Sequence, residues 1–555
     1  MRPPGSRRGF PVACGRLALP VTLGRAAARV ARRSSRIRHN RRTTRENSAP
    51  SVPGVLATTR TFSLLGIEVR EVHVEVDVCQ RGLQTFSLVG LPDAAVRESR
   101  ERVRSALENS GFDFPKHRIT ANLAPADLRK AGPSFDLAIA AGLLIASGQL
   151  PAERLEGVVL AGELALDGSI RPVPGTLAMA EAAARLEVTA IVVPTANGSE
   201  AALPQRPRVI PLERLEQLRQ LGSVEEPPPP PSAELSLNGA GPVGPDLSDL
   251  RGQPYLRDAL EIAAAGGHSL LIVGPPGAGK SLAARRLPSI LPPLSRADAM
   301  EVLRIASACG RLANGALPTQ RPFRAPHHTI STAGLVGGSS PPRPGEVTLA
   351  HRGVLFLDEL GEFSRESLEA LRQPLEEGRV AITRARGAVE LPCRFMLVAA
   401  SNPCPCGRGE ESGECECRPA SARRYRAKLS GALADRIDLS VGVERPTAQE
   451  MAAGAPVGSA GVRERVVAAR ERQERRLGLG RCNADMTLAE LRDATSLTRE
   501  ARRTLAQGHA QLRLSGRGHD RVLRVSRTIA DLEGSDAITD EHVARAIGLR
   551  RRGSE

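Results

Sequence analysis

Long apolar runs are missing from this 555-residue sequence. The longest, Leu137 to Ala146, spans ten residues, whereas a membrane-spanning helix needs about 20. Tryptophan is absent and lysine is scarce, with four lysines among 77 basic residues. We therefore expect a soluble, cytoplasmic protein without a membrane partner.

Acidic residues are nearly absent from the first 50 residues, which contain thirteen arginines and one glutamate, Glu46. This stretch carries about +12 of the net charge of +16, so residues 51–555 carry about +4. The basic charge that would suggest nucleic-acid binding therefore belongs mainly to one end of the chain.

Residues 1–54 form a basic extension without hydrophobic periodicity, which we expect to be disordered. Three interpretations are open for this segment. It has the composition of a transit peptide, it suits an arm that holds DNA phosphates, or translation starts later, near Val55. We favour the last, because an ordered pattern begins just after this point.

Four further segments make this an α/β multidomain chain. Residues 55–222 alternate strand and helix patterns and predict an α+β domain. Residues 223–247 contain five consecutive prolines, typical of a stiff linker. Residues 248–446 predict an α/β nucleotide-binding domain. Residues 447–555 are charged and helical, with threonines that predict helix N-caps at Thr487, Thr498 and Thr539.

A glycine-rich loop stands between the apolar run Leu270–Val273 and a helix-forming stretch, and it reads Gly274, Pro275, Pro276, Gly277, Ala278, Gly279, Lys280 and Ser281. The pattern G-x-x-x-x-G-K-[ST] between a strand and a helix predicts a P-loop. Glycines let backbone N–H groups approach phosphate oxygens at a helix N-terminus. Lys280 can reach the β- and γ-phosphates and Ser281 can ligate Mg²⁺. We therefore predict ATP and Mg²⁺ as ligands.

A second nucleotide motif follows about 80 residues after the P-loop. The apolar run Val354–Leu357 ends in Asp358 and Glu359. Asp358 can hold Mg²⁺ together with Ser281, and Glu359 can orient and deprotonate the attacking water. Such an ending is common by itself, but after a complete P-loop it is strong evidence for nucleotide hydrolysis.

The segments around this second motif carry a specific resemblance. They are Arg321–Thr329, Gly337-Gly338, Pro342–Glu346 and Ala350–Gly353. Together they resemble the magnesium-chelatase-like AAA+ ATPases of the ComM (YifB) family, and the resemblance covers about residues 60–550. It implies a Lon-protease-like α+β domain at the N-terminus, a P-loop AAA+ α/β motor domain and a helical C-terminal lid.

The resemblance also implies roles for three further residues. Asn402, after the predicted strand Phe395–Ala400, is similar to the sensor residue that holds the lytic water or the γ-phosphate. Arg436 resembles an arginine finger that reaches the nucleotide of a neighbouring subunit. Arg517 is our choice for the second sensor, with Arg521 the runner-up and Arg524 a further arginine of the same segment. A finger acting in trans implies a homo-oligomer, and the family suggests a hexameric ring.

Two substrate-contacting regions are implied by the same resemblance. It places His327 and His328 in an insertion that projects from the motor domain. It places Arg384 and Arg386 in a hairpin that precedes Asn402. We expect a ring to touch its substrate at these insertions.

The Lon-like segment Gly132-Pro133-Ser134 places Ser134 where Lon proteases have their nucleophile. In those proteases a lysine beyond a second segment activates the serine. Residues 174–185, which occupy that place here, contain no lysine. A serine without a base is a poor nucleophile, so we expect a domain that shares the fold without proteolytic activity.

Four of the nine cysteines, Cys404, Cys406, Cys415 and Cys417, lie within fourteen residues. Nine cysteines in a long chain without a secretory segment favour a reducing compartment. The four thiols suit a tetrahedral Zn²⁺ site, although one residue between paired ligands is fewer than usual. Reduced structural thiols and a redox pair are the alternatives.

The motifs predict an ATPase, and the family resemblance implies that it forms a ring and remodels DNA, with single-stranded or branched DNA as its partner. The resemblance to ComM suggests branch migration, a helicase-type activity, in recombination and natural transformation. A motor subunit of the magnesium-chelatase type, which acts on a partner protein, is the alternative. An ATP-dependent protease is a third interpretation, and the missing lysine speaks against it.

Overall fold

The structure of the protein is a computed structural model. It describes residues 55–79, 83–223, 226, 228–230, 245–312, 320–338, 342–384, 387–409, 413–429, 433, 436–452 and 457–550. The predicted extension 1–54 and most of the predicted linker lie outside these residues. Within them, no helix is both long and apolar enough to cross a membrane.

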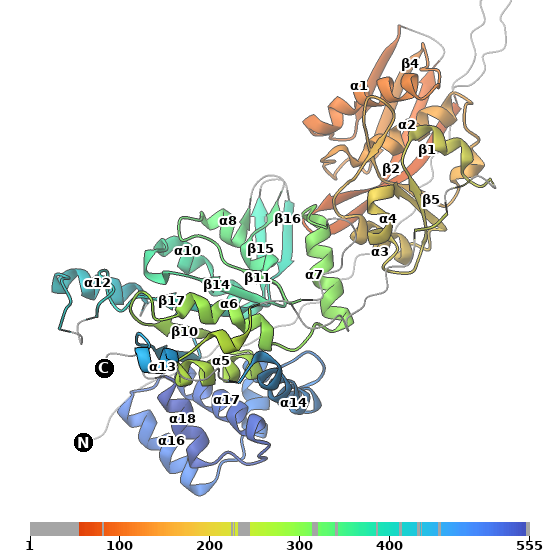
Figure 1. The fold of residues 1–555 in the computed structure, drawn as a ribbon. Helices are drawn as coiled ribbons and strands as arrows, with labels where there is room; N and C mark the ends of the chain where they lie inside the picture. The colour runs from red at the N-terminus through yellow and green to blue at the C-terminus, as the bar shows by residue number, and fades with distance from the viewer. Residues whose placement is uncertain are drawn as a thin grey trace, which may run out of the picture. The chain divides into compact units, whose positions relative to one another are not determined.

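The N-terminal domain contains a mixed sheet, whose described strands have the order β3-β4-β2-β1-β5-β8-β9. Strands β1, β2, β4 and β5 of this sheet are labelled in Figure 1. Its strands are β1 (Val55–Leu65), β2 (Glu68–Cys79), β3 (Thr85–Val89), β4 (Arg118–Ala124), β5 (Val158–Leu160), β8 (Ala190–Pro194) and β9 (Arg208–Leu212). Strand β1 pairs antiparallel with β2 and parallel with β5. Its helices are α1 (Ala94–Asn109), α2 (Asp136–Ala146), α3 (Thr176–Arg185) and α4 (Gly198–Ala201), and a short hairpin joins β6 (Glu163–Leu164) to β7 (Ile170–Arg171).

Every residue of helix α2 is buried. It is the run Leu137 to Ala146 that the sequence shows as its longest apolar stretch, extended by Asp136. The neighbouring strand β1 buries the polar side chains of Thr59, Thr61 and Ser63. Thr59 Oγ1 donates a hydrogen bond to the Ala138 carbonyl oxygen at 2.9 Å, which offsets the cost of burying its hydroxyl.

Ser134 lies in a 3₁₀ turn (Pro133–Phe135) at the start of α2, and it is 6% exposed. Lys130, four residues earlier, is fully buried, and its ammonium donates a hydrogen bond to the Pro125 carbonyl oxygen. Among the described residues, no base forms a hydrogen bond with the Ser134 hydroxyl. The absence of proteolytic chemistry stays a prediction, and this geometry is compatible with it.

The predicted nucleotide-binding domain is built on a parallel sheet with the described strand order β11-β14-β17-β10-β18. These strands are β11 (Phe323–Arg324), β14 (Val354–Leu357), β17 (Met396–Ser401), β10 (Leu270–Val273) and β18 (Leu439–Gly442). The helices are α5 (Pro254–Gly266), α6 (Lys280–Ile290), α7 (Arg296–Ala308), α8 (Thr332–Val336), α9 (Glu346–Leu349), α10 (Arg365–Ala370), α11 (Arg372–Glu377) and α12 (Pro419–Leu429).

Two small antiparallel pairs accompany this sheet, β12 (Gly337–Gly338) with β13 (Arg343–Pro344), and β15 (Arg379–Arg384) with β16 (Gly387–Pro392). The second pair is the hairpin predicted before Asn402. Arg386, which we expected in this hairpin, lies outside the described residues, and so does the side chain of Arg384.

The C-terminal part of the chain is helical, as predicted, and is coloured blue in Figure 1. It contains α13 (Ala448–Ala452), α14 (Ser459–Leu477), α15 (Leu488–Ala494), α16 (Arg499–Gln511), α17 (Gly516–Glu533) and α18 (Asp540–Gly548). The predicted caps are confirmed, because Thr487, Thr498 and Thr539 are the N-cap residues of α15, α16 and α18.

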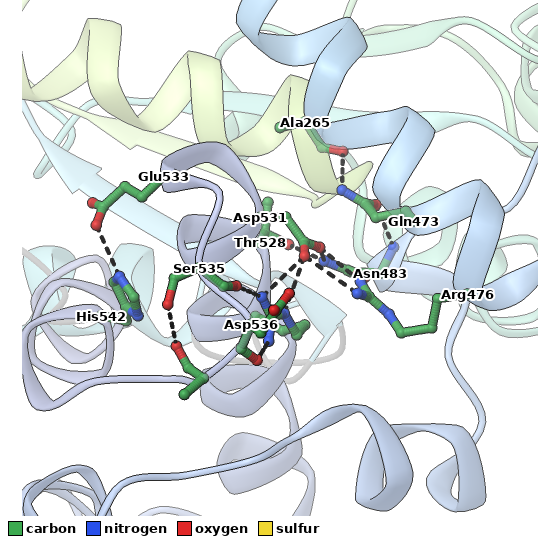
Figure 2. A network of polar contacts seen from close by, with 12 residues as sticks. Ala265, Gln473, Arg476, Asn483, Thr528, Asp531, Glu533, Ser535, Asp536 and His542 are labelled. Atoms are coloured by element: carbon green, nitrogen blue, oxygen red, sulfur yellow. Dashed lines mark hydrogen bonds and ion pairs between the residues drawn. The ribbon is translucent and has the colours of Figure 1, made fainter.

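A buried polar network holds these helices to α5 of the nucleotide-binding domain (Figure 2). Gln473 of α14 donates a hydrogen bond to the Ala265 carbonyl oxygen at 3.0 Å and accepts one from the Asn483 backbone at 2.8 Å. The Asn483 amide and the Arg476 guanidinium both donate to Asp531 Oδ2 of α17, at 2.8 and 2.7 Å. Because each buried group finds a partner, the network fixes α14 and α17 in one arrangement.

Candidate functional site

The candidate site forms where three neighbouring strands of the parallel sheet end. Strand β17 pairs with β10 on one side and β14 on the other. Carboxyl ends of parallel strands meet at one sheet edge, where ligands of α/β proteins bind. The P-loop follows β10, Asp358 and Glu359 follow β14, and Asn402 follows β17. Three stretches separated by up to 122 residues thus meet at this edge.

The P-loop has the backbone that its glycines predict. Gly277 and Gly279 have φ of +82° and +86°, in the left-handed region that side chains with a Cβ rarely adopt. A Cβ on Gly274 would lie 2.3 Å from the Val443 carbonyl oxygen, so only glycine fits beside β18. Helix α6 begins at Lys280, directly after this loop. The loop therefore directs backbone N–H groups and a helix N-terminus at one point.

Lys280 is 92% buried and lies at the centre of the site. Its Nζ donates hydrogen bonds to the carbonyl oxygens of Gly274 and Pro275, at 2.6 and 2.9 Å, and to Asn402 Oδ1 at 3.0 Å. Burial lowers the pKa of the Lys280 ammonium, and the nearby charges of Asp358 and Glu359 partly oppose that shift. Lys280 thus links the P-loop directly to Asn402.

Two oxygen atoms from separate motifs form a candidate Mg²⁺ site. Ser281 Oγ donates a hydrogen bond to Asp358 Oδ2 at 2.7 Å. The other carboxylate oxygen of Asp358 accepts a hydrogen bond from the Glu359 backbone N–H at 3.0 Å. A hydroxyl and a carboxylate are the hard oxygen donors that Mg²⁺ prefers, usually alongside water and phosphate oxygens. These residues therefore fit the ion that their motifs imply.

Glu359 adopts an uncommon backbone conformation, with a φ of +51° and ψ of +50°. Its side chain is half exposed, and its Oε2 lies 3.3 Å from Nδ1 of His328. A non-glycine residue in this region costs about 1–3 kcal/mol, and such residues concentrate at functional sites. The strain and the exposure are both compatible with a carboxylate that acts on water.

His328 does not project from the domain as we expected, and that expectation is wrong. Besides Glu359, its ring packs edge-on against buried Phe363, with ring centroids 6.4 Å apart. The reason is topological, because the short strand β11 pairs in parallel with β14. Residues that follow β11 are thereby delivered to the same edge as Glu359. A two-residue strand leaves no hydrophobic pattern, so the sequence offered little signal.

The motifs line a common cavity of roughly 280 Å³. Its walls are Pro276, Gly277, Ala278, Gly279, Lys280, Ser281, Leu282, Asp358, Glu359, Ser401 and Asn402. Gly274 and Pro275 lie behind this wall and contact Lys280 through their carbonyl oxygens. Every other residue predicted for the P-loop, the acidic pair and the first sensor faces the cavity.

The predicted arginines are not among the residues that line this cavity. Arg436 and Arg517 both form ion pairs with Glu376 of α11, and the Arg517 pair measures 3.5 Å. The Arg436 side chain is largely buried, whereas that of Arg517 is exposed. The structure thus groups two arginines around one carboxylate away from the P-loop.

The two alternatives to Arg517 have structural contacts. Arg521 pairs with Asp438 at 3.2 Å, and Arg524 donates a hydrogen bond to the Met486 carbonyl oxygen at 2.8 Å. Asp438 also accepts a hydrogen bond from the Ser269 backbone N–H at 3.1 Å, next to β10. The Arg521–Asp438 pair joins α17 to the core of the nucleotide-binding domain, whereas the Arg524 bond stays within the C-terminal helical part.

The side chains of the four clustered cysteines come together in the structure, as a shared metal site would require. The sulfur atoms of Cys404, Cys406, Cys415 and Cys417 all lie within 4.8 Å of one another. Cys404 is buried, and the other three are partly exposed. The cluster begins two residues after Asn402, which lines the cavity, and the neighbouring Gly407 packs against Pro276 of the cavity wall.

Comparison with known proteins agrees with this geometry. A family model for magnesium chelatase, subunit ChlI, matches residues 246–451. Models for subunit ChlI of Mg-chelatase and for the ChlI C-terminal part match residues 74–197 and 457–550. All three segments of the structured chain are therefore similar to magnesium chelatase subunits.

Full-length relatives are more specific. The YifB protein of Salmonella typhimurium is 42% identical over 502 residues, which cover 89% of this chain and 97% of YifB. Competence protein ComM of Haemophilus influenzae is 41% identical over 500 residues, which cover 89% of this chain and 97% of ComM. The chain belongs to the ComM (YifB) family of magnesium-chelatase-like proteins.

The magnesium-chelatase 38 kDa subunit of Acidiphilium rubrum is a relative that matches a smaller part of this chain. It is 27% identical over 312 residues, which cover 51% of this chain and 83% of that subunit. The family predicted from the sequence is therefore confirmed. Membership in an AAA+ ATPase-like family implies nucleotide binding and oligomerisation.

Proposed function

We propose that the protein is a ring-forming ATPase that couples ATP hydrolysis to the remodelling of DNA. The observation that supports hydrolysis best is the common cavity, because P-loop, acidic pair and Asn402 all face it. Each of these motifs is weak evidence by itself. Their convergence on one cavity supplies phosphate binding, ion ligation and a base at the same place.

ATP would bind with its phosphates against the P-loop. The N–H groups of the loop and the N-terminus of α6 favour the negative charge, and the Lys280 ammonium exchanges a carbonyl contact for a phosphate oxygen. Ser281 and Asp358 would hold Mg²⁺, which neutralises phosphate charge when bound. Asn402, fixed by Lys280, orients the attacking water or the γ-phosphate.

Glu359 is the proposed general base. It accepts the proton of the attacking water, so that the hydroxide oxygen forms a bond to the γ-phosphorus while the bond to the β-phosphate oxygen breaks. His328 holds the Glu359 carboxylate from the side at 3.3 Å. His328 is thus a positioning residue, whereas Glu359 is a catalytic one.

Arg436 is the proposed finger, and it would serve the active site of a neighbouring subunit in a hexameric ring. Its location away from the cavity of its own chain supports this assignment. Arg517 is the proposed second sensor. Since both arginines pair with Glu376, a neighbouring nucleotide would compete with that carboxylate for them.

DNA is the proposed substrate because ComM, a relative that matches over 89% of this chain and 97% of its own length, is named a competence protein. Uptake and recombination of DNA, with single-stranded or branched intermediates, is the process to which such a name refers. The alternative is a chelatase-type motor that acts on a partner protein, which the similarity to the 38 kDa chelatase subunit favours.

ATPase rates of the full chain with single-stranded, duplex and forked DNA, each at two salt concentrations, distinguish these functions. A DNA motor predicts stimulation that is strongest on forked DNA and weakens at high salt, because phosphate contacts release counterions. A chain that starts at Val55 should retain that stimulation. Hydrolysis that no DNA stimulates would contradict the DNA proposal and favour the partner-protein motor.

A further inference from the structure

We propose that Cys404, Cys406, Cys415 and Cys417 hold one Zn²⁺, and that this zinc knuckle braces the wall of the nucleotide cavity. The first observation is the separation of the sulfur atoms. Cys404 Sγ lies 3.3 Å from Cys406 Sγ and 3.7 Å from Cys415 Sγ, and Cys406 Sγ lies 3.8 Å from Cys415 Sγ.

These separations match a tetrahedral zinc site. With Zn–S bonds of about 2.3 Å, the sulfur atoms at the corners of a tetrahedron are about 3.8 Å apart. A disulfide needs about 2.05 Å, and the nearest pair is 3.3 Å apart. One Zn²⁺ at the centre would bind all four thiolates, whereas a disulfide would use two of the sulfur atoms and leave the other two unbonded.

Backbone donors support the charge that the sulfur atoms carry in such a site. The Cys406 N–H donates to Cys417 Sγ and the Gly409 N–H donates to Cys404 Sγ, both at 3.3 Å. Hydrogen bonds of this kind orient metal-bound thiolates and reduce their negative charge. Arg408 bridges the two arms of the knuckle through Glu416 at 2.7 Å.

The knuckle touches the P-loop on one side. Gly407 has a φ of +81°, and a Cβ there would lie 2.8 Å from Cδ of Pro276, which lines the cavity. The Gly407 backbone is therefore packed directly against the P-loop. Only glycine satisfies both the backbone conformation and the contact.

The helix that follows the knuckle touches the opposite wall. Lys428 of α12 donates a hydrogen bond to the Gly361 carbonyl oxygen at 3.0 Å, two residues after Glu359. Tyr425 Oη lies 3.4 Å from Ser401 Oγ at the end of β17. The knuckle itself thus contacts the P-loop, and the helix that follows it contacts the segment after the acidic pair.

Metal analysis of the full chain, purified under reducing conditions without chelator, tests the site. We expect about one zinc per chain, as in other tetrathiolate sites. The double variant Cys415→Ser/Cys417→Ser should lose the zinc, while Cys79→Ser, which changes a cysteine outside the cluster, should retain it. Since the double variant can fail to fold, a second measurement uses the wild type: loading with Co²⁺ should give the absorption of a tetrahedral thiolate complex.

Wild-type protein without zinc and without that Co²⁺ absorption would overturn the metal site, as would a disulfide between Cys404 and Cys406 in mass spectra. The bracing role rests on the proposed ATPase function, so it has its own test. Gly407→Ala should keep the zinc and raise the KM for ATP several-fold. If Gly407→Ala holds a full complement of zinc and its KM for ATP is unchanged, the bracing role is overturned. If the wild-type protein holds zinc but hydrolyses no ATP, the result counts against the proposed function alone.

Discussion

Ser281 Oγ and Asp358 Oδ2 lie 2.7 Å apart, although 77 residues separate them in the sequence. The contact joins the first turn of α6 to the end of β14. It places a hydroxyl and a carboxylate where a hard cation beside a P-loop would bind.

Replacing Asp358 with Asn should therefore lower kcat/KM for Mg-ATP by about 100-fold or more, because the carboxylate charge that holds Mg²⁺ is lost. Asp249→Asn is the matched control, since Asp249 pairs with Arg286 outside the cavity lining. Steady-state rates over a Mg²⁺ titration provide the measurement. A variant with wild-type Mg²⁺ dependence would show that the ion binds elsewhere.

His328→Ala should lower kcat about tenfold and leave the KM for ATP nearly unchanged. His328 contacts the Glu359 carboxylate but is absent from the cavity wall, so its loss affects the position of the base and not nucleotide binding. His327→Ala is the control, because His327 is exposed, and its ring lies tilted against that of His328, whereas the carboxylate of Glu359 pairs with His328. Equal rates for both variants would contradict the positioning role.

Arg436→Ala should lower the ATPase rate about 1,000-fold while ATP binding persists, as expected for an arginine finger. Mixing this variant with inactive Lys280→Ala protein tests action in trans. Mixed rings contain interfaces in which an intact P-loop faces an intact Arg436, so the mixture should hydrolyse ATP faster than either variant alone. If mixing restores no activity, Arg436 acts within its own chain or not on nucleotide.

The Asp438 carboxylate predicts a pH dependence of stability. Burial opposes its ionisation, but the imidazole of His268, whose Nδ1 lies 3.6 Å from Asp438 Oδ2, and the charge of Arg521 outweigh burial and lower the pKa of Asp438 from 3.8 to about 2. Because the pKa is lower in the folded state, the stabilisation is complete above about pH 4 and is lost as the pH falls towards 2.

The shift corresponds to about 2 kcal/mol of unfolding free energy. Asp438→Asn should therefore be less stable than the wild type at pH 7, and the difference should shrink between pH 4 and pH 2. Urea denaturation at several pH values measures this difference. A difference that stays constant down to pH 2 would show that the carboxylate charge does not stabilise the fold.

The sequence predicted the site's strands well because each is a buried apolar run with a clear end. Val354–Leu357 is followed by two acidic residues and Leu270–Val273 by glycine, and the structure places β14 and β10 at these bounds. Strand β1 has no such run, since it buries Thr59, Thr61 and Ser63. Its place beside α2 depends on tertiary contacts that no local pattern encodes.

Two features of the site could not be predicted from the sequence alone, because they depend on the three-dimensional arrangement of the chain. His328 reaches Glu359 only because β11 pairs with β14, and sequence spacing does not reveal which strands are neighbours. The cysteine spacing suggested a metal site, yet it also allowed a redox pair. The distances between the sulfur atoms favour the metal site that we propose, and they become available only when the chain folds.

The most direct test of the account compares Glu359→Gln with the wild type and with Glu362→Gln, an exposed glutamate three residues later, in ATP binding and hydrolysis. The account predicts that Glu359→Gln binds ATP as tightly as the wild type, hydrolyses it at least about 100-fold more slowly and accumulates as ATP-bound rings, while Glu362→Gln behaves as the wild type. Hydrolysis by Glu359→Gln at the wild-type rate would contradict the assignment of the base, and with it the proposed chemistry of the cavity.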